Sequence, residues 1–284
     1  MKSLAGGGQA ARRVHVTRDD FEPWMTLWRL EPDGEPFTTR FKSRLAPVRA
    51  AGTPAMLKIA QGEERRGAPL MAWWAGDGAA RVLDWDDPAI LLERATGERS
   101  LVAMTRAGED EAATRILSQA LLRLHTERPG PLPAHLTPLP EWFAALPPAA
   151  ERHGGILATS WRLARELLRT PRDLRPLHGD LHHENVLDAG ARGWLAIDPK
   201  GLFGERGFDY AFMTCTPDLE TAGAPGVLAR RARIVCAEAG LELERYLRWV
   251  VACAGLSASW TLGEGEDATP ALTIARLAAA ELGL

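Results

Sequence analysis

The chain has 284 residues, of which 46% are hydrophobic and 25% are charged, so it can bury one large core or two medium ones. Its net charge of −3 gives no reason to expect nucleic acid or an anionic membrane as the main partner. The three cysteines, Cys215, Cys236 and Cys253, form no CxxC pair, so neither a disulfide framework nor a thiolate zinc site is indicated. The composition predicts a globular protein of a reducing compartment.

No stretch of the sequence has the pattern of a membrane segment. The first residues, MKSLAGGGQAARRVHV, lack the apolar core of about 7 to 15 residues that a secretory signal needs. The longest apolar stretch, residues 249–262, is shorter than the roughly 20 residues that span a bilayer. We therefore expect a cytoplasmic protein without a membrane partner.

Residues 24–93 have the pattern of an antiparallel sheet. Short segments rich in threonine, valine and aromatic residues alternate there with turn signals such as PDGEP at 32–36 and AAGTP at 50–54. Lysine and arginine outnumber acidic residues in the first 66 positions by 12 to 8, which favours anions. We expect residues 1–95 to form a small β-rich lobe.

Helical periodicity replaces this pattern from Asp110 onward. The apolar residues that share one helix face are Ile116, Leu117, Ala120, Leu121 and Leu124 in one segment, and Leu243, Tyr246, Leu247, Val250, Val251 and Ala254 in another. Seven prolines lie between Pro129 and Pro148, which predicts a meandering surface connection. Residues 96–284 are predicted to form a larger helical lobe.

Polar side chains are concentrated in the sequence LHGDLHHENVL at 177–187. A segment of helical pattern stops at Pro171, so this stretch is predicted to be a loop with apolar anchors. Two apolar runs, at 186–187 and 194–197, then surround a glycine-containing turn. They predict a small hairpin that ends at Asp198.

Three oxygen-bearing side chains flank this hairpin. Asp180 and Asn185 lie five residues apart at its front, and Asp198 lies thirteen residues after Asn185. The hairpin can therefore bring all three to one end of a sheet. Such hard oxygen ligands suit Mg²⁺, which takes one or two carboxylates together with substrate phosphates.

The three histidines of the loop have two interpretations. We favour His178 as a brace of the loop, with His182 and His183 exposed or bonded to a partner. A zinc site built from them is the alternative. It is disfavoured because Leu181 separates them from Asp180 and because the sequence has no HExxH motif.

The spacing of these residues resembles that of protein-kinase-like phosphotransferases, HRDLxxxN followed by a metal-binding aspartate. Here it reads HGDLHHEN at 178–185 and IDP at 197–199, forms that point to aminoglycoside phosphotransferases. Together with PAMLKIA, WWAGDGAARVL, LLERATG and GWLAIDPKGLFGERGFDYA, the set is similar to the streptomycin 6-phosphotransferases of the aminoglycoside and hydroxyurea resistance kinase family. The resemblance runs from about Trp24 to the C-terminus.

This resemblance implies an α+β, protein-kinase-like fold of two lobes, with nucleotide binding in residues 1–95 and catalysis and substrate binding in residues 96–284. It implies a transferase that uses ATP and Mg²⁺ to phosphorylate an aminoglycoside, most simply streptomycin at its 6-hydroxyl, and so confers antibiotic resistance. Asp180 would orient the acceptor hydroxyl, while Asn185 and Asp198 hold the metal.

Lys58 is one of only four lysines, against thirty arginines, and it lies in the apolar strand sequence PAMLKIA. By the same resemblance it binds the nucleotide phosphates, as the lysine of V-A-I-K does. The alternative is a strand-edge lysine that keeps its ammonium group in water. Its expected acidic partner is Glu64 of the following helix, which Pro69 is expected to interrupt.

Two further segments are assigned to the nucleotide by the resemblance. TRFKSR, at 39–44, lies where kinases cover the phosphates, and it has no glycine. Ser43 and backbone N–H groups would bind there, with positive charge from Lys42 and Arg44. In the connector LLERATG, the backbone from Glu93 to Ala95 would contact the adenine edge.

The acceptor side is less defined. Carboxylates bind guanidinium groups through paired hydrogen bonds, so acidic residues of the helical lobe are candidates for the substrate site. They are Glu205, Asp218, Glu264, Glu266 and Asp267. Asp209, in FDYA, is expected to brace the catalytic loop. Phe212, Thr216 and Lys200 depart from the family pattern and are expected to affect the choice of acceptor.

Other classes of function remain as alternatives. The sequence contains neither GxxxxGK[ST] nor GxSxG, which excludes a P-loop enzyme and argues against an α/β-hydrolase. A kinase of another small hydroxylated molecule, such as hydroxyurea or a different antibiotic, is the alternative enzyme. A non-catalytic kinase-like binding protein is the second alternative, against which the complete set of Lys58, Asp180, Asn185 and Asp198 argues.

Overall fold

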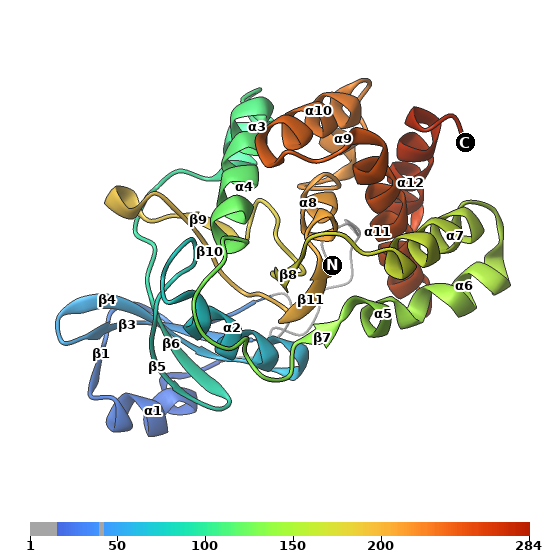
Figure 1. Ribbon diagram of the computed structural model, residues 1–284. Helices are drawn as coiled ribbons and strands as arrows, with labels where there is room; N and C mark the ends of the chain where they lie inside the picture. The colour runs from blue at the N-terminus through green and yellow to red at the C-terminus, as the bar shows by residue number, and fades with distance from the viewer. Residues whose placement is uncertain (1–15, 40–42) are drawn as a thin grey trace.

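A computed structural model describes residues 16–39 and 43–284, apart from the side chains of Glu63 and Glu64. An antiparallel sheet forms its N-terminal part and helices form most of its C-terminal part (Figure 1). The predicted α+β fold of two lobes is confirmed. The boundary after residue 95 stays a prediction, and residues 94–100 are neither helix nor strand.

Within the described residues, the N-terminal sheet has six strands in the order β1-β3-β4-β6-β5, with β2 beside β3, and every pair is antiparallel. They are β1 (Leu30–Pro32), β2 (Phe37–Thr38), β3 (Arg44–Ala50), β4 (Thr53–Ile59), β5 (Val82–Asp86) and β6 (Ala89–Glu93). Ala51 and Gly52 join β3 to β4 with positive φ angles of 47° and 77°. They form the tight turn predicted from AAGTP.

Side chains of β4 alternate between the two faces of the sheet because strand geometry has a period of two. Leu57 and Ile59 lie on the outer face, in a small apolar cluster with Phe21. Lys58 lies between them in the sequence and pairs in register with Ile90 of β6. The register therefore directs Lys58 to the opposite face, toward the helical lobe.

Residues 22–27 form a helix, so the expectation that the sheet pattern begins at Trp24 is wrong there. The 3-10 turn η1 (Arg18–Phe21) leads into α1 (Glu22–Leu27). Pro23 in the first turn and the acidic Glu22 beside it favour a helix start. Trp24 and Trp28, which suggested a strand, pack against the outer face of the sheet.

Helix α2 (Gly67–Trp74) lies against the sheet and joins the apolar core of the helical lobe. It follows the 3-10 turn η2 (Gly62–Arg66), and Pro69 lies in its first turn, where proline is tolerated. The expected interruption at Pro69 is therefore wrong. A Cβ on Gly67 would lie 2.2 Å from the carbonyl oxygen of Pro199, so only glycine permits this close approach.

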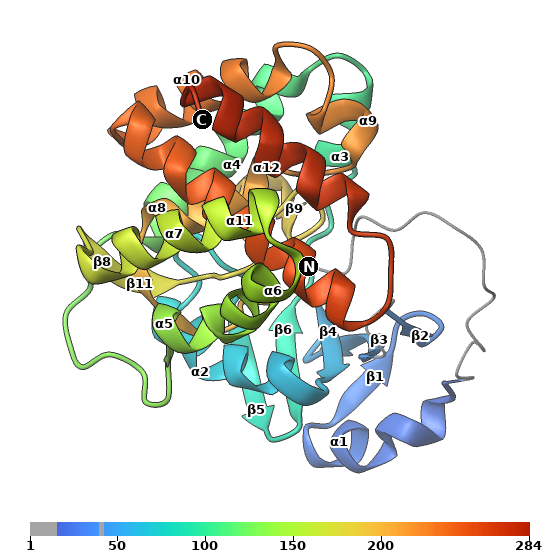
Figure 2. The ribbon, with the colours of Figure 1, turned by 90° about the vertical axis from the view of Figure 1, so that its right-hand side faces the viewer.

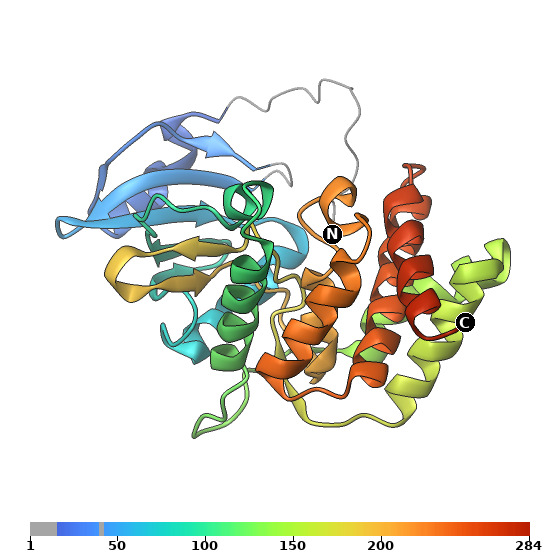
Figure 3. The same cartoon turned by 90° about the horizontal axis from the view of Figure 1, so that it is seen from above.

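The helices of the C-terminal part are α3 (Leu101–Arg106), α4 (Asp110–Leu124), α5 (Leu139–Trp142), α6 (Leu146–His153), α7 (Gly155–Arg169), α8 (Gly207–Met213), α9 (Leu219–Ala222), α10 (Val227–Ala239), α11 (Leu243–Gly263) and α12 (Thr269–Glu281). Helix α11 packs against α7, α8 and α12 (Figures 2 and 3). Its predicted apolar face is buried except for Leu243 at its start. Within the described residues, no helix is long and apolar enough to cross a membrane.

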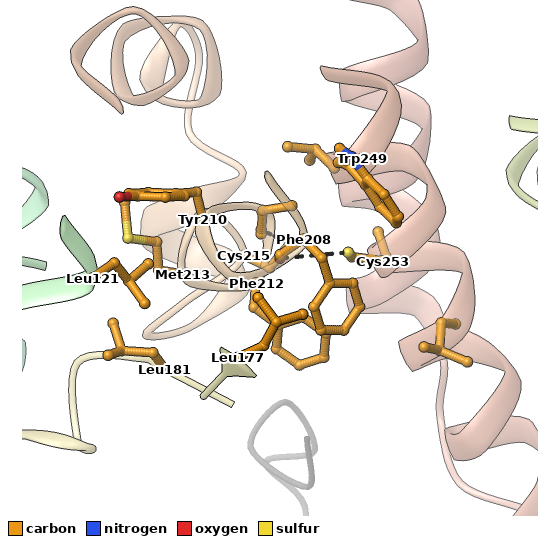
Figure 4. Close-up of a cluster of buried hydrophobic side chains, with 14 of the residues drawn as sticks. Leu121, Leu177, Leu181, Phe208, Tyr210, Phe212, Met213, Cys215, Trp249 and Cys253 are labelled. Carbon is orange, nitrogen blue, oxygen red and sulfur yellow. Dashed lines mark hydrogen bonds between the residues drawn. The ribbon is translucent and has the colours of Figure 1, made fainter. Parts of the chain in front are cut away.

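Helices α8 and α11 build the core beside the sequence LHGDLHHENVL. The ring centroids of Phe208 and Phe212 of α8 lie 5.2 Å apart, and Phe208 packs edge-on against Trp249 of α11. Leu177 and Leu181 belong to the same buried cluster (Figure 4). The predicted apolar anchors of the loop are therefore confirmed.

The three cysteines are free thiols. Cys215 and Cys253 are buried, and their sulfur atoms lie 3.9 Å from the carbonyl oxygens of Ala211 and Phe208 (Figure 4). Burial raises the pKa of the Cys215 thiol to about 12. These side chains act as small apolar core residues.

The proline-rich segment is a surface connection only in its first half. Residues 125–136 are irregular, but β7 (Thr137–Pro138), α5, the 3-10 turn η3 (Phe143–Ala145) and α6 then follow in close succession. Prolines occupy the first turns of α5 and α6, where the missing N–H has no intrahelical partner to lose. The expected meander ends at residue 136 for this reason.

Two small sheets carry the polar loop. The first contains β7, β8 (Leu174–Leu177) and β11 (Leu202–Glu205), and the second is the predicted hairpin of β9 (Val186–Asp188) and β10 (Trp194–Ala196) around η4 (Gly190–Arg192). Ala196 of the hairpin donates its N–H to Gly78 and accepts that of Ala80, both at 2.9 Å. The hairpin is thus joined to the segment that follows α2.

A buried ion pair joins α4 to α10. Arg231 is 1% exposed, and its Nη2 atom lies 2.6 Å from Oδ1 of Asp110. Its Nη1 donates to the carbonyl oxygens of Thr214 and Thr216, at 3.0 and 2.5 Å. Burial alone would raise the pKa of Asp110, but hydrogen bonds from Arg231 hold it below its usual value.

We expect Arg231→Met to lower the free energy of unfolding by about 3–5 kcal/mol, because the buried Asp110 carboxylate loses its partner. The folded-state pKa of Asp110 is depressed, so this stabilisation is present above the unfolded-state value of about 3.9. It is lost as the pH falls through the folded-state value. Urea unfolding at pH 7 measures this loss of free energy. The difference in free energy of unfolding between the wild type and Arg231→Met should become smaller in acid.

The control is Arg248→Met, which removes the partner of the exposed Glu244. Exposed pairs contribute about 0–1 kcal/mol, so this variant should unfold almost like the wild type. Equal losses in the two variants would show that the Arg231 pair adds nothing through its burial.

Candidate active site

One buried carboxylate of the core binds residues 178–185, which are the predicted catalytic loop and are called the catalytic loop below. Asp209 of α8 is fully buried and accepts hydrogen bonds from the backbone N–H groups of His178 at 2.8 Å and Gly179 at 2.7 Å. Nε2 of His125 lies 2.8 Å from the same carboxylate. The prediction that Asp209 braces this loop is confirmed. His125 was missed, because a lone histidine at the end of a helix carries no signal of such a contact.

The histidines of the loop are buried and structural. Nε2 of His178 bonds to the carbonyl oxygen of Ile197 at 2.8 Å, and its ring stacks on Trp74 of α2. Nδ1 of His183 bonds to the hydroxyl of Thr216 at 2.9 Å, and burial lowers the pKa of His183 to about 3. The bracing role of His178 and the bonded state of His183 are confirmed. His182 is also buried, since only 8% of its surface is exposed.

Asp180, Asn185 and Asp198 meet at the end of the β9–β10 hairpin, as its geometry predicted. Nδ2 of Asn185 donates to the carbonyl oxygen of Asp180 at 2.8 Å. The N–H of Ile197 donates to the carbonyl oxygen of Asn185 at 2.9 Å. Asp198, the next residue, has a φ of 61°, a left-handed conformation that few non-glycine residues adopt. The backbone turns there and directs the carboxylate toward the sheet lobe.

Two lysine–aspartate pairs cross this end of the hairpin. Nζ of Lys58 lies 2.8 Å from Oδ1 of Asp198, and Nζ of Lys200 lies 3.2 Å from Oδ2 of Asp180. Lys58 is 4% exposed, which rules out the alternative of an ammonium group in water. Burial alone would raise the pKa of Asp198, but the ammonium group of Lys58 holds it below the usual range. The Asp198 carboxyl group is therefore ionised at neutral pH.

The side-chain oxygens of Asn185 and Asp198 fit a Mg²⁺ ion that is bound by the protein and by phosphate together. The Nδ2 group of Asn185 is used by the carbonyl of Asp180, which leaves its amide oxygen as the acceptor beside the carboxylate of Asp198. Across the described chain, no three His, Cys, Asp or Glu side chains gather as a metal site. One carboxylate and one amide oxygen suit Mg²⁺ completed by phosphate oxygens.

A pocket opens beside the Lys58–Asp198 pair, between the sheet and α2. Its lining includes Lys58, Met71, Ile90, Leu92, Asp198 and Pro199. Apolar side chains from β6 and α2 form one wall, and the Lys58–Asp198 pair forms another. The pocket therefore joins an apolar surface to a charged end, as a nucleotide site requires.

At the end of β6 and in the connector after it, backbone groups rather than side chains are available to a nucleotide. The carboxylate of Glu93 bonds to Arg192 and accepts the backbone N–H of Arg81 at 2.7 Å. The N–H of Arg94 donates to Pro54 at 3.3 Å. Within the described residues, the N–H of Ala95 donates no hydrogen bond. The predicted contact of Glu93 and Ala95 with adenine stays a prediction that this geometry permits.

The remaining residues predicted to bind the phosphates are only partly described. Ser43 is buried at the start of β3, and Lys42 and the side chain of Glu64 lie outside the described residues, so their roles stay predictions. Arg44 is different, because it pairs in register with Ile59 and so shares the outer face of the sheet. Its Nη1 lies 2.6 Å from Asp20. The expected charge of Arg44 near the phosphates is wrong, since strand alternation turns it away.

The acidic residues proposed for the substrate separate into three groups. Glu205 is 5% exposed, and it accepts hydrogen bonds from Arg245, from the indole of Trp249 and from the backbone of Arg172. The assignment of Glu205 to the substrate site is wrong, because both of its carboxylate oxygens already accept hydrogen bonds in the core. Asp218 caps α9 through the N–H of Thr221 at 2.9 Å and remains partly exposed.

The third group, Glu264, Glu266 and Asp267, is exposed on the connection between α11 and α12 and stays a prediction. Among the residues that depart from the family pattern, Phe212 is 1% exposed in the core, so it cannot contact an acceptor. Thr216 touches the catalytic loop through His183.

Comparisons with known proteins agree with this geometry. Residues 27–265 match the model of the aminoglycoside/hydroxyurea antibiotic resistance kinases. The chain belongs to this family. The kinase is 50% identical over 247 residues to a streptomycin 3''-kinase of Klebsiella pneumoniae, covering 85% of this chain and 92% of that protein. It is 34% identical over 270 residues to a streptomycin 6-kinase of Streptomyces griseus, covering 89% and 85%.

Solved structures share the fold of the kinase. An aminoglycoside phosphotransferase of Streptomyces rimosus, in complex with ADP and streptomycin, matches with a TM-score of 0.54 at 18% identity. The match covers 84% of this chain and 98% of that chain. The predicted family is confirmed, and its members are phosphotransferases with a hydroxyl acceptor.

We expect Asp209→Asn to loosen the catalytic loop of the kinase. Each buried N–H that loses its acceptor costs about 1–3 kcal/mol, and one amide oxygen cannot replace the carboxylate. Native-state hydrogen exchange at the amides of His178 and Gly179 should become faster, and the urea midpoint should fall. Asp173→Asn, at a surface pair with Arg206, is the control. Unchanged exchange at both amides in Asp209→Asn would contradict the brace.

Proposed function

We propose that the kinase transfers the γ-phosphate of ATP to a hydroxyl group of streptomycin in the cytoplasm, and so confers resistance. The observation that carries this proposal is the meeting of Lys58, Asp180, Asn185 and Asp198 at one end of the hairpin. The 50% identity to a streptomycin kinase over 92% of its length supports streptomycin as the acceptor.

The chemistry of each group suggests its role. Asp180, a carboxylate paired with Lys200, orients the acceptor hydroxyl and takes its proton. Lys58 offsets the negative charge of the nucleotide phosphates. When bound, Mg²⁺ would be held by Asn185 and Asp198 and would neutralise phosphate charge. The backbone of Glu93 and Ala95 would bind the adenine edge.

The acceptor hydroxyl has two candidates on different rings of streptomycin. The 6-hydroxyl, expected from the sequence motifs, lies on the streptidine ring, and relatives at 34% identity include a 6-kinase. The 3''-hydroxyl lies on the terminal amino sugar, and the relative at 50% identity is a 3''-kinase. We propose the 3''-hydroxyl, because the higher identity extends over nearly the whole of that relative. The 6-hydroxyl is the alternative.

Asp218 is the acidic residue that we propose for the guanidinium groups of the substrate. It follows Thr216, whose hydroxyl contacts His183 of the catalytic loop. Its carboxylate is partly exposed and already binds one guanidinium, that of Arg106, at 3.0 Å. A guanidinium of streptomycin would take the place of Arg106 in the same kind of contact.

We expect the purified kinase, with Mg²⁺ and ATP, to add one phosphate to streptomycin and none to kanamycin, whose amines do not reproduce planar guanidinium forks. Mass spectrometry of each product measures this, with hydroxyurea as a third acceptor. Fragmentation should place the phosphate on the terminal amino sugar. Phosphate on the streptidine fragment would select the 6-hydroxyl instead.

Other outcomes of this experiment decide between the remaining alternatives. Phosphorylated hydroxyurea or kanamycin, with streptomycin unchanged, would reject the acceptor and keep the phosphotransferase. Nucleotide binding with no product from any of the three would favour either a different small hydroxylated acceptor or the non-catalytic kinase-like binding protein, and ATP hydrolysis by the kinase alone would select the former.

Two variants should separate the roles of the two aspartates. Asp180→Asn should bind Mg·ATP like the wild type and lower kcat on the order of 10²-fold or more, because it cannot accept the hydroxyl proton. Asp198→Ala should lose the magnesium dependence of ATP binding. Calorimetry with Mg²⁺ and with EDTA measures the second effect. A wild type that binds ATP equally in both conditions would refute the metal assignment.

A further inference from the structure

Lys200 has no role in the scheme above, although its backbone is packed against the catalytic loop. It follows Asp198 and Pro199 in the connection between β10 and β11. Its N–H donates to the carbonyl oxygen of His178 at 2.7 Å. A Cβ on Gly179 would lie 3.2 Å from the Cβ of Lys200, so the two segments are in close contact. The lysine side chain therefore starts beside the loop that carries Asp180.

The contact between Lys200 and Asp180 is buried. Nζ lies 3.2 Å from Oδ2, and the side chains are 13% and 5% exposed. The attraction between two unit charges is stronger in such a place than in water. Removing one partner of a buried pair also leaves an uncompensated charge. This ion pair consequently differs from the exposed pairs of the surface, which contribute little.

The position of this cation matches a need of phosphoryl transfer. The transferred phosphoryl group spreads negative charge over its oxygens, and the acceptor hydroxyl approaches beside the carboxylate of Asp180. The carboxylate and the phosphoryl group repel each other unless a cation lies between them. Lys58 offsets charge from the sheet lobe, where it pairs with Asp198. Lys200 is the lysine on the side of Asp180.

The choice of lysine also fits this position. The chain has four lysines among 34 basic residues, yet two of the four, Lys58 and Lys200, pair with the aspartates of the site. Arginine presents a planar fork that occupies both oxygens of a carboxylate. Lysine is a compact charge with three donors, so it can bind one carboxylate oxygen and still donate to a phosphate.

We propose that Lys200 is a positioning residue, which holds the Asp180 carboxylate toward the acceptor hydroxyl and offsets its charge as the phosphoryl group approaches. The inference rests on the proposed function. In the step, the acceptor oxygen forms a bond to the γ-phosphorus as the bond from that phosphorus to the β–γ bridging oxygen breaks. The hydroxyl proton passes to Asp180, and Lys200 keeps its protons throughout.

The first test compares kcat with nucleotide affinity. Lys200→Met should lower kcat on the order of 10²-fold, as the loss of one preorganised donor does, with the Kd of Mg·ATP within about threefold of wild type. Lys200→Gln, which keeps a polar group, should show a similar loss, and Lys200→Arg should recover part of the rate. Arg248→Met controls for the loss of a surface cation. The unfolding midpoints of all variants are measured alongside.

The second test is a double-mutant cycle with Asp180→Asn. If Lys200 acts through Asp180, then Lys200→Met lowers kcat much less in the Asp180→Asn background than in the wild type. Fully multiplicative losses would overturn the proposal. A kcat for Lys200→Met and Lys200→Gln within about threefold of wild type would overturn it too.

The two proposals fail in different ways. The rate of the wild type on streptomycin tests the acceptor alone. The ratio of variant to wild type, measured with streptomycin and again in slow ATP hydrolysis with water as the acceptor, tests Lys200. If the Lys200→Met variant has the same rate as the wild type in both reactions, the positioning role is rejected, even where streptomycin is the true substrate.

Discussion

The hydrogen bonds that Asp209 accepts join the catalytic loop to the helical core, and the rest of the site depends on them. A fully buried carboxylate is stable only when its oxygens are satisfied, and here two backbone N–H groups and His125 contact it. Helix α8, which carries Asp209, is packed through Phe208 against α11. The loop therefore takes its position from the buried core of the helical lobe.

Charge is the second constraint on this site. A centre that is proposed to receive nucleotide phosphates beside two aspartates would concentrate negative charge in a place with little solvent. The structure offsets each aspartate with one lysine, Lys58 for Asp198 and Lys200 for Asp180. The lysines come from different segments, one from the sheet and one from the β10–β11 connection.

The features that the sequence predicted are those that depend on local periodicity and spacing. The hairpin and the meeting of Asp180, Asn185 and Asp198 follow from short-range pattern. The errors at the candidate site concern partners that are distant in the sequence. Glu205 looked available, but Arg245, forty residues later, binds it. Arg44 lies on the outer face because of strand register, which the sequence did not reveal.

The choice between acceptor hydroxyls need not involve the residues that hold the loop of Asp180. Asp209 and the hairpin position that loop, and the proposed transfer makes the same demand on it for any ring that presents a hydroxyl. Relatives at 50% and 34% identity are kinases of different hydroxyls of streptomycin. The connection between α8 and α9 contacts the loop through Thr216 and His183, and Arg231 binds the carbonyl oxygens of Thr214 and Thr216 in that connection. On the proposed function, substitutions in the connection would change which hydroxyl reaches Asp180, while Asp209 keeps the loop in place.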